Sequence, residues 1–579
     1  MFPAVLAALA SLAGCKDFLT EHPTENLFST QIYANRETAY TAVIGCYSML
    51  VGGYYAAPWT ETIQPSSIFV CTGQDVGSTS LGAGALDLAN MARFNIDPNH
   101  SGVSAAWSGV YAAISRCNTT IAGIEQSSGI SDDDKSKLLG EVRFLRGFNY
   151  FNVVRTWGRA PMPMIPPTTI ADAHQGRVGV DTLFRTIIDD LKYAEANMPT
   201  KAEQVWGKPC NTAATAFLAK VYAAMASSSY GGGGSYYFVG RANPWADSTD
   251  AFWNEAYNYA KKVYDSGTYS LVPDYNDLWM ARTKNTSESI FEIQFNAITS
   301  PGNNWAWGTY VGFSMFTPNS TTNNNGNRIK GSRAVYNWQV AKYTAADPRM
   351  NANYIMGGYF MSNPMASTYP NAVWIFPTDT IPGPTITRVT NWPVTFPCLK
   401  KYFDPAWTSG ATANINWPVY RYDDLILTLA EAANEIGRPK DEVVGYVNEV
   451  LQRARNSGPG GAAAPQAQPA PWDPNDPALA TQEGMREAIM RERLFEMPCE
   501  GQEWFDVRRR GVAWFKMMAE ESNTELLSHQ YSSDVGRVNQ ILVPTDTMLV
   551  RKFLFFPIPQ TEINANWAYA TNKDQNFGY

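Results

Sequence analysis

Several stretches of this chain repeat apolar residues at intervals of three and four positions, the pattern of helices that bury one face. Those in the N-terminal half lie at about 105–124, 135–156, 182–197, 211–227 and 252–266. Two more follow each other at about 425–436 and 443–454, separated by the turn-forming run Gly437-Arg438-Pro439. Helices joined by short turns pack as antiparallel pairs, so the chain is predicted to be mainly α, with a stack similar to tetratricopeptide repeats (TPR).

Strand-like sequence is sparse in this chain. Residues 289–295 alternate in polarity and are β-branched or aromatic, which predicts one strand. The segment at about 296–410 is rich in Asn, Thr, Gly, Pro and Trp and has no sustained period, so we expect loops and short turns there. The low-complexity runs at Gly231–Gly234 and at about 456–477 are predicted to be exposed loops.

The composition narrows the possible partners. Hydrophobic residues make up 45% of the chain and aromatic residues 13%, which excludes wholesale disorder. The formal net charge is −8, whereas a general nucleic-acid-binding protein needs a basic surface, so nucleic acid is excluded as a partner. Most rings at helical spacing, such as Tyr150, Phe151 and Trp157, are expected to lie in the core.

The chain opens with an uncharged apolar run, Phe2–Gly14, that ends at Cys15. This run is shorter than the about 20 residues of a spanning helix and matches the apolar part of a secretory signal. The ending Leu12-Ala13-Gly14-Cys15 is similar to a bacterial lipobox, although no Lys or Arg precedes the apolar run. We therefore expect residues 1–14 to be a lipoprotein signal peptide and Cys15 to carry the lipid anchor.

The remaining cysteines are scattered and form no C-x-x-C pair, which argues against a zinc or thioredoxin-type site. They are expected to be small buried apolar residues, with one or two disulfides left open. Their positions are Cys46, Cys71, Cys117, Cys210, Cys398 and Cys499.

Catalytic motifs are missing from the sequence. The 4 histidines are unpaired at metal-ligand spacing and are expected on the surface or in loops, and no nucleophile elbow, Walker loop or dinucleotide fingerprint is present.

Glu492, Glu496 and Glu500 lie at four-residue intervals, which would place them on one face of a continuous helix. A glycosidase uses two such carboxylates, but the arginines around them (Arg491, Arg493 and Arg508–Arg510) favour a structural network of ion pairs. We expect no catalytic residue, no metal and no cofactor.

A series of landmarks resembles the SusD/RagB family of Bacteroidetes outer-membrane lipoproteins. In the N-terminal half they are Cys15-Lys16-Asp17-Phe18-Leu19 with Pro23, Trp107 with Tyr111, Ile114 and Asn118, the run Glu141–Pro161, Ser266–Tyr269 and Glu288–Glu292. Further along they are Asp347-Pro348-Arg349, Arg421–Glu431, Arg491–Arg509, Phe555–Pro559 with Glu562, and Gln575–Tyr579. The match spans nearly the whole chain, although Asp424 stands where the family usually has Glu.

The resemblance implies an architecture and a role. Residues 15–579 would form a single SusD-like domain with about four TPR-like helix pairs, at about 30–270 and 415–515, and a loop-rich ligand-binding part with a few short strands. Such proteins are lipid-anchored at the cell surface, in the outer membrane, and act with a SusC-like TonB-dependent transporter. They capture glycans, or peptides in the RagB branch, and are not enzymes.

The run Asn303–Tyr310 is the best candidate for a ligand site. It sets aromatic rings beside amides in a loop, and a flat indole can cover the C–H face of a sugar while amides bond its hydroxyls. The resemblance adds two regions, about 58–103 and 296–330, that supply the ligand surface. Their candidate residues are Trp59, Asp75, Arg93 and Asn95, then Asn303, Trp305, Trp307 and Tyr310.

A glycan-binding role is therefore expected for this chain. Three alternatives stay open: peptide or other nutrient binding on the same scaffold, a surface hydrolase that uses a carboxylate such as Glu496, and a purely structural lipoprotein.

Overall fold

The structure is a computed structural model of the full chain. It describes residues 29–50, 96–229, 236–238, 243–280, 283–295, 342–344, 346–355, 359–360, 373–374, 398–399, 401, 416–498, 500–528, 545–569 and 575–579.

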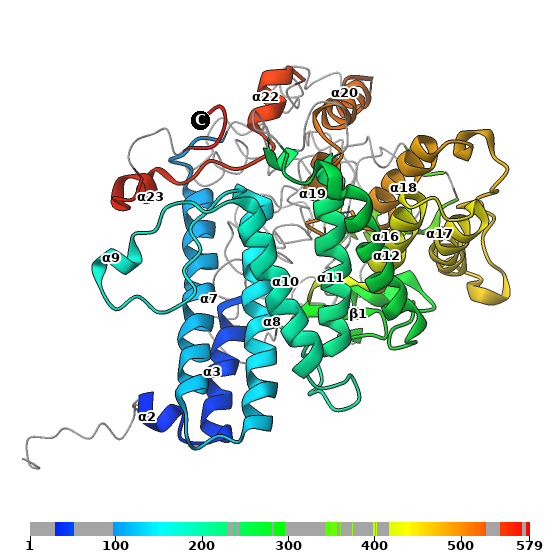
Figure 1. Cartoon of the computed structure of the whole chain (residues 1–579). Coiled ribbons are helices and arrows are strands. Elements are labelled where there is room, and N and C mark those ends of the chain that lie inside the picture. The colour runs from blue at the N-terminus through cyan, green and yellow to red at the C-terminus, as the bar shows by residue number, and fades with distance from the viewer. Residues whose placement is uncertain are drawn as a thin grey trace, which may run out of the picture.

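The N-terminal half is a stack of long helices that lie side by side (Figure 1). Its helices are α2 (Ser29–Ile32), α3 (Arg36–Met49), α7 (Ser101–Gln126), α8 (Asp132–Trp157), α9 (Ile170–Ala173), α10 (Val180–Asn197), α11 (Asn211–Ala226) and α12 (Thr249–Asp265). Helix α8 packs against α7 and α10, and α11 packs against α10 and α12. The helices predicted for this half are confirmed, each within about four residues of its expected ends.

Helix α8 shows why these segments begin and end where they do. The Ser131 side chain accepts a hydrogen bond from the Asp134 backbone N–H, and three aspartates, Asp132–Asp134, occupy the positive first turn. At the other end Gly158 has φ +70°, a conformation that favours glycine, and the helix stops there.

An aromatic cluster joins this stack to the first strand. The Phe144 ring lies edge-on to Phe217 and Phe291, with centroids 5.3 and 5.4 Å away, and Phe148 contacts the same two rings. All four rings are buried, and burying one such side chain contributes about 1.5–3 kcal/mol. Tyr150, Phe151 and Trp157 are buried as well, so the expectation that helical rings serve the core is confirmed.

The C-terminal half begins with helices on the right of Figure 1 and ends with helices at the top and left of that view. Its helices are α16 (Tyr422–Glu435), α17 (Lys440–Asn456), α18 (Gln482–Glu496), α19 (Glu503–Arg509), α20 (Val512–Ser528), α22 (Thr547–Lys552) and α23 (Gln560–Ala565). Helix α16 packs against α11, α12, α17 and α18, which joins the two groups. The predicted turn between α16 and α17 is confirmed, with Gly437 at φ +72° and Pro439 directly before α17.

The strands are short and pair in twos. The predicted strand is β1 (Ser289–Ile293), and it runs antiparallel to β6 (Trp417–Arg421), with Ser289 opposite Arg421. The structure also describes α15 (Pro348–Asn353), β2 (Tyr354–Ile355) paired with β5 (Cys398–Leu399), and β3 (Tyr359–Phe360) paired with β4 (Val373–Trp374). Strand β6 has no alternation because all five of its residues are buried, so the period of two did not mark it.

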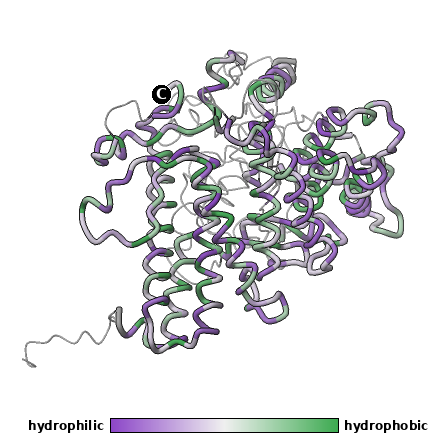
Figure 2. The backbone as a smooth tube through the Cα atoms, in the orientation of Figure 1, coloured by the Kyte–Doolittle hydropathy of each residue, from purple (hydrophilic) through white to green (hydrophobic). Residues whose placement is uncertain are grey.

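Other expectations have mixed outcomes. The run at 456–477 is a mostly exposed loop with a short 3₁₀ turn at Gly461–Ala463, as predicted, whereas Gly231–Gly234 lies outside the described residues. The thiols of Cys46, Cys117 and Cys210 are buried and unbridged. Polar and apolar residues alternate along the helices (Figure 2), and no helix in the described part of the chain has the length and apolar character needed to cross a membrane.

Candidate functional site

The side chains predicted to contact ligand all lie outside the residues that the structure describes. They are Trp59, Asp75, Arg93, Asn95, Asn303, Trp305, Trp307 and Tyr310. The lipidation candidate Cys15 lies outside as well. These assignments therefore stay predictions, and what the structure does describe is the frame that carries the predicted ligand segment.

That frame is the β1–β6 pair. The Phe295 backbone N–H donates to Asn416 Oδ1 at 3.0 Å, and the Asn416 amide donates to Glu292 Oε2 at 2.9 Å and Gln294 Oε1 at 2.8 Å. The chain that leaves β1 and the chain that enters β6 are thus bonded side by side. The whole segment 296–415, which contains the predicted ligand run Asn303–Tyr310, begins and ends at one place.

A buried cluster of charges lies beside this frame, and we term it the ionic core. Every residue in this cluster is at most 6% exposed. Its members are the cations Arg349, Lys401, Arg421 and Arg453 and the carboxylates Glu288, Asp347, Asp423, Glu492, Glu496 and Glu500.

Arg349, on α15, attaches the segment 296–415, which we term the insert, to α18. Its guanidinium meets both Asp347 carboxylate oxygens, with Nη2 2.7 Å from Oδ2. Its Nη1 lies 2.5 Å from Glu492 Oε1 and 2.8 Å from Glu496 Oε2. A planar guanidinium can bond several carboxylates in fixed directions, so this one residue sets how the insert lies on the helix.

Three further cations connect the other elements. Arg453 of α17 bridges Glu288 at 2.7 Å and Glu496 at 2.5 Å. Arg421 of β6 bridges Glu288 at 2.7 Å and Glu500 at 2.8 Å. Lys401, the second cation from the insert, lies 2.7 Å from Glu500. The ionic core thus ties the insert, β6, α17 and α18 to one another.

The geometry corrects one detail of the sequence interpretation. Helix α18 ends at Glu496, two residues before Pro498, which cannot continue a helix, so the three glutamates do not share one helix face. Gly501, with φ +78°, turns the chain after the helix. Glu500 still reaches the cluster, because Arg421 and Lys401 hold its carboxylate.

The pKa values of two of these carboxylates, Glu496 and Asp423, are shifted in opposite directions. Burial pushes the pKa of Glu496 upward, but Arg453 and Arg349 outweigh it and hold that pKa well below its usual range. The pKa of Asp423 is raised well above its usual range by burial, with Arg421 opposing and Glu288 and Glu496 adding to the rise. Glu496 therefore keeps its charge, whereas Asp423 favours its protonated form.

These carboxylates are structural. Glycoside hydrolysis needs two carboxyl groups that face a sugar, with about 5–10 Å between them. Here Glu492 and Glu496 are buried and bonded to arginines, which leaves them no access to a substrate. The interpretation of Glu492, Glu496 and Glu500 as part of an ion-pair network is confirmed, but the expected partners are corrected: Arg491 pairs with Glu521 and Arg493 with Asp424 instead. The sequence did not identify Arg349 or Lys401 as partners, because both come from a segment far from α18 along the chain.

A second buried cluster lies on the other side of α18. Arg493 bonds Asp424 at 2.6 Å and Asp506 at 2.9 Å, and Lys220 of α11 bonds Asp424 at 2.6 Å. Arg509 bonds Glu431 and Asp506. Against the effect of burial, Lys220 and Arg493 hold the pKa of Asp424 well below its usual range. Asp424, the departure from the family pattern, is thus a fully paired structural residue.

The histidines that the structure describes do not belong to any metal-binding group. His100 lies in the loop before α7, as expected, but it is buried and caps the helix, with Nδ1 accepting from the Gly102 backbone N–H. His174 stacks on Trp567, while His22 and His529 lie outside the described residues. Within the described ranges, no group of three or more His, Cys, Asp or Glu side chains is arranged to hold a metal ion.

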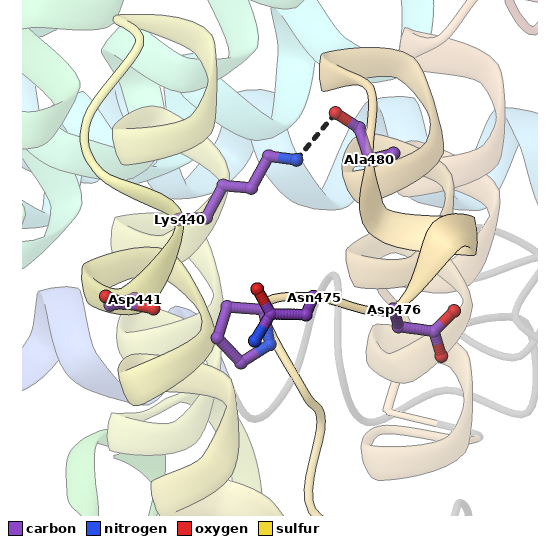
Figure 3. Close-up of a pocket in the computed structure, with 6 residues that line it drawn as sticks. Lys440, Asp441, Asn475, Asp476 and Ala480 are labelled. Atoms are coloured by element: carbon purple, nitrogen blue, oxygen red, sulfur yellow. Dashed lines mark hydrogen bonds between the residues drawn. The ribbon is translucent and has the colours of Figure 1, made fainter.

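A shallow pocket of about 360 Å³ lies between the start of α17 and the loop before α18 (Figure 3). Lys440 Nζ donates to the Ala480 carbonyl at 2.7 Å across its top. The carboxylates of Asp441 and Asp476 lie on opposite sides of Asn475 and do not converge on a point (Figure 3). The lining contains no aromatic ring, so this pocket does not have the features expected of a sugar site.

Comparison with known protein families decides the relationship. A family model described as "SusD family" matches residues 248–579. The chain belongs to the SusD family. A second family model, described as "Starch-binding associating with outer membrane", matches residues 78–223.

Individual relatives are distant but cover the chain. SusD-like protein P25 of Formosa agariphila is 22% identical over 523 residues, which are 87% of this chain and 88% of the relative. A SusD homolog from Bacteroides thetaiotaomicron superposes with a TM-score of 0.68 at 20% identity, over 97% of this chain and 99% of that chain. Surface glycan-binding protein A from the same species, solved in complex with laminarihexaose, has a TM-score of 0.63 at 19% identity, over 94% of this chain and 99% of that chain. These similarities confirm the SusD-like, mainly α fold.

Proposed function

We propose that this protein is a cell-surface glycan-binding lipoprotein of the outer membrane that captures an oligosaccharide or polysaccharide and passes it to a SusC-like TonB-dependent transporter. The observation that carries the proposal is the match over nearly the whole chain to SusD-like proteins, among them one solved with laminarihexaose. A second structural neighbour is described as a laminarin-binding SusD-like protein.

The described residues support binding without catalysis. The carboxylates that first suggested hydrolysis are buried and paired with cations. The ion pairs of Arg349 attach the segment 296–415 to α18, and the Phe295–Asn416 hydrogen bond holds the two ends of the segment together. A segment attached at both ends to a rigid base loses less conformational freedom when a ligand binds, which favours affinity.

The aromatic run Trp305–Tyr310 would stack on sugar rings while Asn303 bonds hydroxyls. Trp59, Asp75, Arg93 and Asn95 would complete the surface from the first loop region. Because no covalent bond forms or breaks, capture and release would depend on weak contacts that allow transfer to the transporter.

Glycan binding is tested with the form that starts at Lys16, by affinity gel electrophoresis against a panel of polysaccharides and by calorimetry with the best oligosaccharide. Trp305→Ala or Trp307→Ala should weaken binding about tenfold, which corresponds to about 1.4 kcal/mol. Trp567→Ala, which removes an exposed indole elsewhere, is the matched control. Binding of peptides with no affinity for any glycan would favour the peptide alternative, and release of shorter sugars would contradict a binding-only role.

The anchor and the partner need separate tests in cells. Cys15→Ala should abolish incorporation of a labelled fatty acid and release the protein from the outer membrane, whereas Cys46→Ala should leave labelling unchanged. Purification of the intact lipoprotein from membranes should recover a TonB-dependent transporter. Recovery of the protein alone would contradict the proposed handover.

A further inference from the structure

The turn segment between α10 and α11, residues 198–210, presents an indole to solvent. Trp206 is 71% exposed and its neighbour Val205 is 59% exposed. Among the tryptophans whose exposure the structure describes, Trp206 and Trp567 are more than half exposed, while the rest lie mostly in the core. Exposed aromatic rings on an ordered segment are typical of binding surfaces.

The segment that carries Trp206 is held in one conformation. Thr200 donates its hydroxyl to Glu203 at 2.8 Å, and the Gln204 side-chain amide donates to the Pro209 carbonyl at 2.8 Å. Gly207 has φ +86° and packs so closely on Gln294 that a Cβ there would lie 3.0 Å from the Gln294 side chain. The indole is therefore positioned by the fold.

A pocket of about 150 Å³ lies beside the indole, lined by residues of this segment, Tyr269 and β1. Most of its polar groups are already bonded to protein. Lys208 pairs with Glu141 at 2.6 Å, Asn285 and Gln294 exchange two amide hydrogen bonds of 2.8 Å, and Glu292 accepts from Asn416.

Lys201 differs from these groups. Its Nζ donates to the Ser289 carbonyl at 3.2 Å and lies 4.1 Å from the centroid of the Tyr269 ring. Within the described part of the chain no carboxylate oxygen lies within 4.0 Å of this ammonium group. Lys201 is exposed. An exposed ammonium group with no carboxylate at ion-pair distance can pair with an anion from outside.

We propose that Trp206 and Lys201 form a secondary glycan-binding site for an acidic sugar. The indole would cover the C–H face of one sugar ring, and the Lys201 ammonium group would pair with a carboxylate or sulfate on that ring. The site is too small for more than about one sugar unit, since pockets for drug-sized ligands measure about 300–1,000 Å³. It rests on the proposed glycan-binding function and adds a preference for acidic glycans.

Two observations favour this ligand over the others. The exposed apolar surface consists of Val205 and Trp206, bordered by polar side chains, whereas protein-docking patches usually extend over several hundred Å². A neutral sugar would use the indole but would supply no anion to the Lys201 ammonium group. The pocket lining also includes Glu292, four residues before the predicted ligand segment 296–330.

The experiment uses the form starting at Lys16 with three probes: dextran, dextran sulfate and polygalacturonate. Trp206→Ala and Lys201→Gln are compared with Trp567→Ala, which removes an equally exposed indole, and with Lys192→Gln, which removes an exposed charge on α10. Trp206→Ala and Lys201→Gln should each weaken binding of an acidic polysaccharide about fivefold to tenfold, and the two controls should not. Raising NaCl to 300 mM should reduce the effect of Lys201→Gln because salt screens the ion pair. Comparison of the sulfated and carboxylated probes shows which anion is preferred.

The outcomes separate this inference from the proposed function. If acidic and neutral glycans bind alike and Trp206→Ala has no effect while Trp305→Ala does, the secondary site is wrong and the proposed function stands. If Trp206→Ala abolishes binding and Trp305→Ala does not, the secondary site stands and the predicted main site is wrong. Absence of binding to every polysaccharide tested would overturn both.

Discussion

Helices α7, α8, α10 and α11 meet mainly through apolar side chains, whereas α16, α17 and α18 meet the insert and β6 through buried ion pairs. In the first region, Phe144, Phe148 and Phe217 interlock at right angles. Charges such as the Arg146–Asp190 pair join them there but do not form a continuous cluster with the ionic core. In the second region, a single arginine, Arg349, contacts three carboxylates, and Arg421 does the same.

The difference shows that each kind of contact suits a different kind of packing. Apolar contact stabilises in proportion to buried area and has little directional requirement, so it suits a stack of regular helices. Buried ion pairs are costly to desolvate and stabilise only when every partner is in place. They suit the attachment of the insert, because Arg349 and Lys401 each have to meet particular carboxylates.

The largest effect is expected for Arg349→Met. The variant leaves Asp347, Glu492 and Glu496 buried with a partner missing, which should lower the free energy of unfolding by about 3–5 kcal/mol. Urea unfolding of the form starting at Lys16 measures this change. Arg349→Lys should recover only part of the loss, because an ammonium group cannot bond Asp347 at two points and reach both glutamates. Arg185→Met, which breaks an exposed pair with Asp181, is the control and should leave the midpoint unchanged. An equally small effect of Arg349→Met would show that the ionic core is not needed for stability.

The pH dependence of Glu496→Gln gives a sharper test. The folded-state pKa of Glu496 lies below the unfolded value of about 4.3, so its contribution to stability is present above that pH and lost as the pH falls toward the folded-state pKa. Glu496→Gln should therefore lower the unfolding free energy by about 3 kcal/mol at pH 7 and by progressively less from pH 5 to pH 3. Asp423 has a raised pKa and acts in the opposite direction, with stability decreasing as the pH rises above its unfolded value. Unfolding curves at pH 3, 4, 5 and 7 check this, and a difference that stays constant with pH would contradict it.

The smallest effect is expected for Phe217→Leu in the apolar stack. Leucine keeps the apolar character and most of the volume, so the unfolding free energy should fall by about 1 kcal/mol, with the same value at pH 5 and pH 7. Phe217→Ala, which leaves a cavity, should cost about 3–5 kcal/mol and shows that the position is buried tightly. A loss of more than about 3 kcal/mol for leucine would mean that this region is as intolerant as the ionic core.

Sequence periodicity predicted α7, α8, α10, α11, α12, α16 and α17, because an amphipathic helix carries its pattern within a few turns, but it did not identify α3 or α20. The turn at Gly437–Pro439 was equally visible, since both residues have strong local preferences. Strand β6 was not predicted, because its five buried residues have no alternation, and its pairing with β1 joins residues more than 100 positions apart. The candidate ligand run Asn303–Tyr310 was predicted from its residue types and stays a prediction.

By itself, the sequence determined the helical stack, the lipobox-like start at Cys15 and membership of the SusD family, because these depend on local pattern and on residue order. It also showed that Glu492, Glu496 and Glu500 required cations. Only the tertiary structure decided which cations meet them, that α18 ends before Glu500 joins the cluster, and that Trp206 and Lys201 line one pocket. The physical reason is that charge pairing and pocket formation depend on distances between side chains that the chain separates by tens or hundreds of residues.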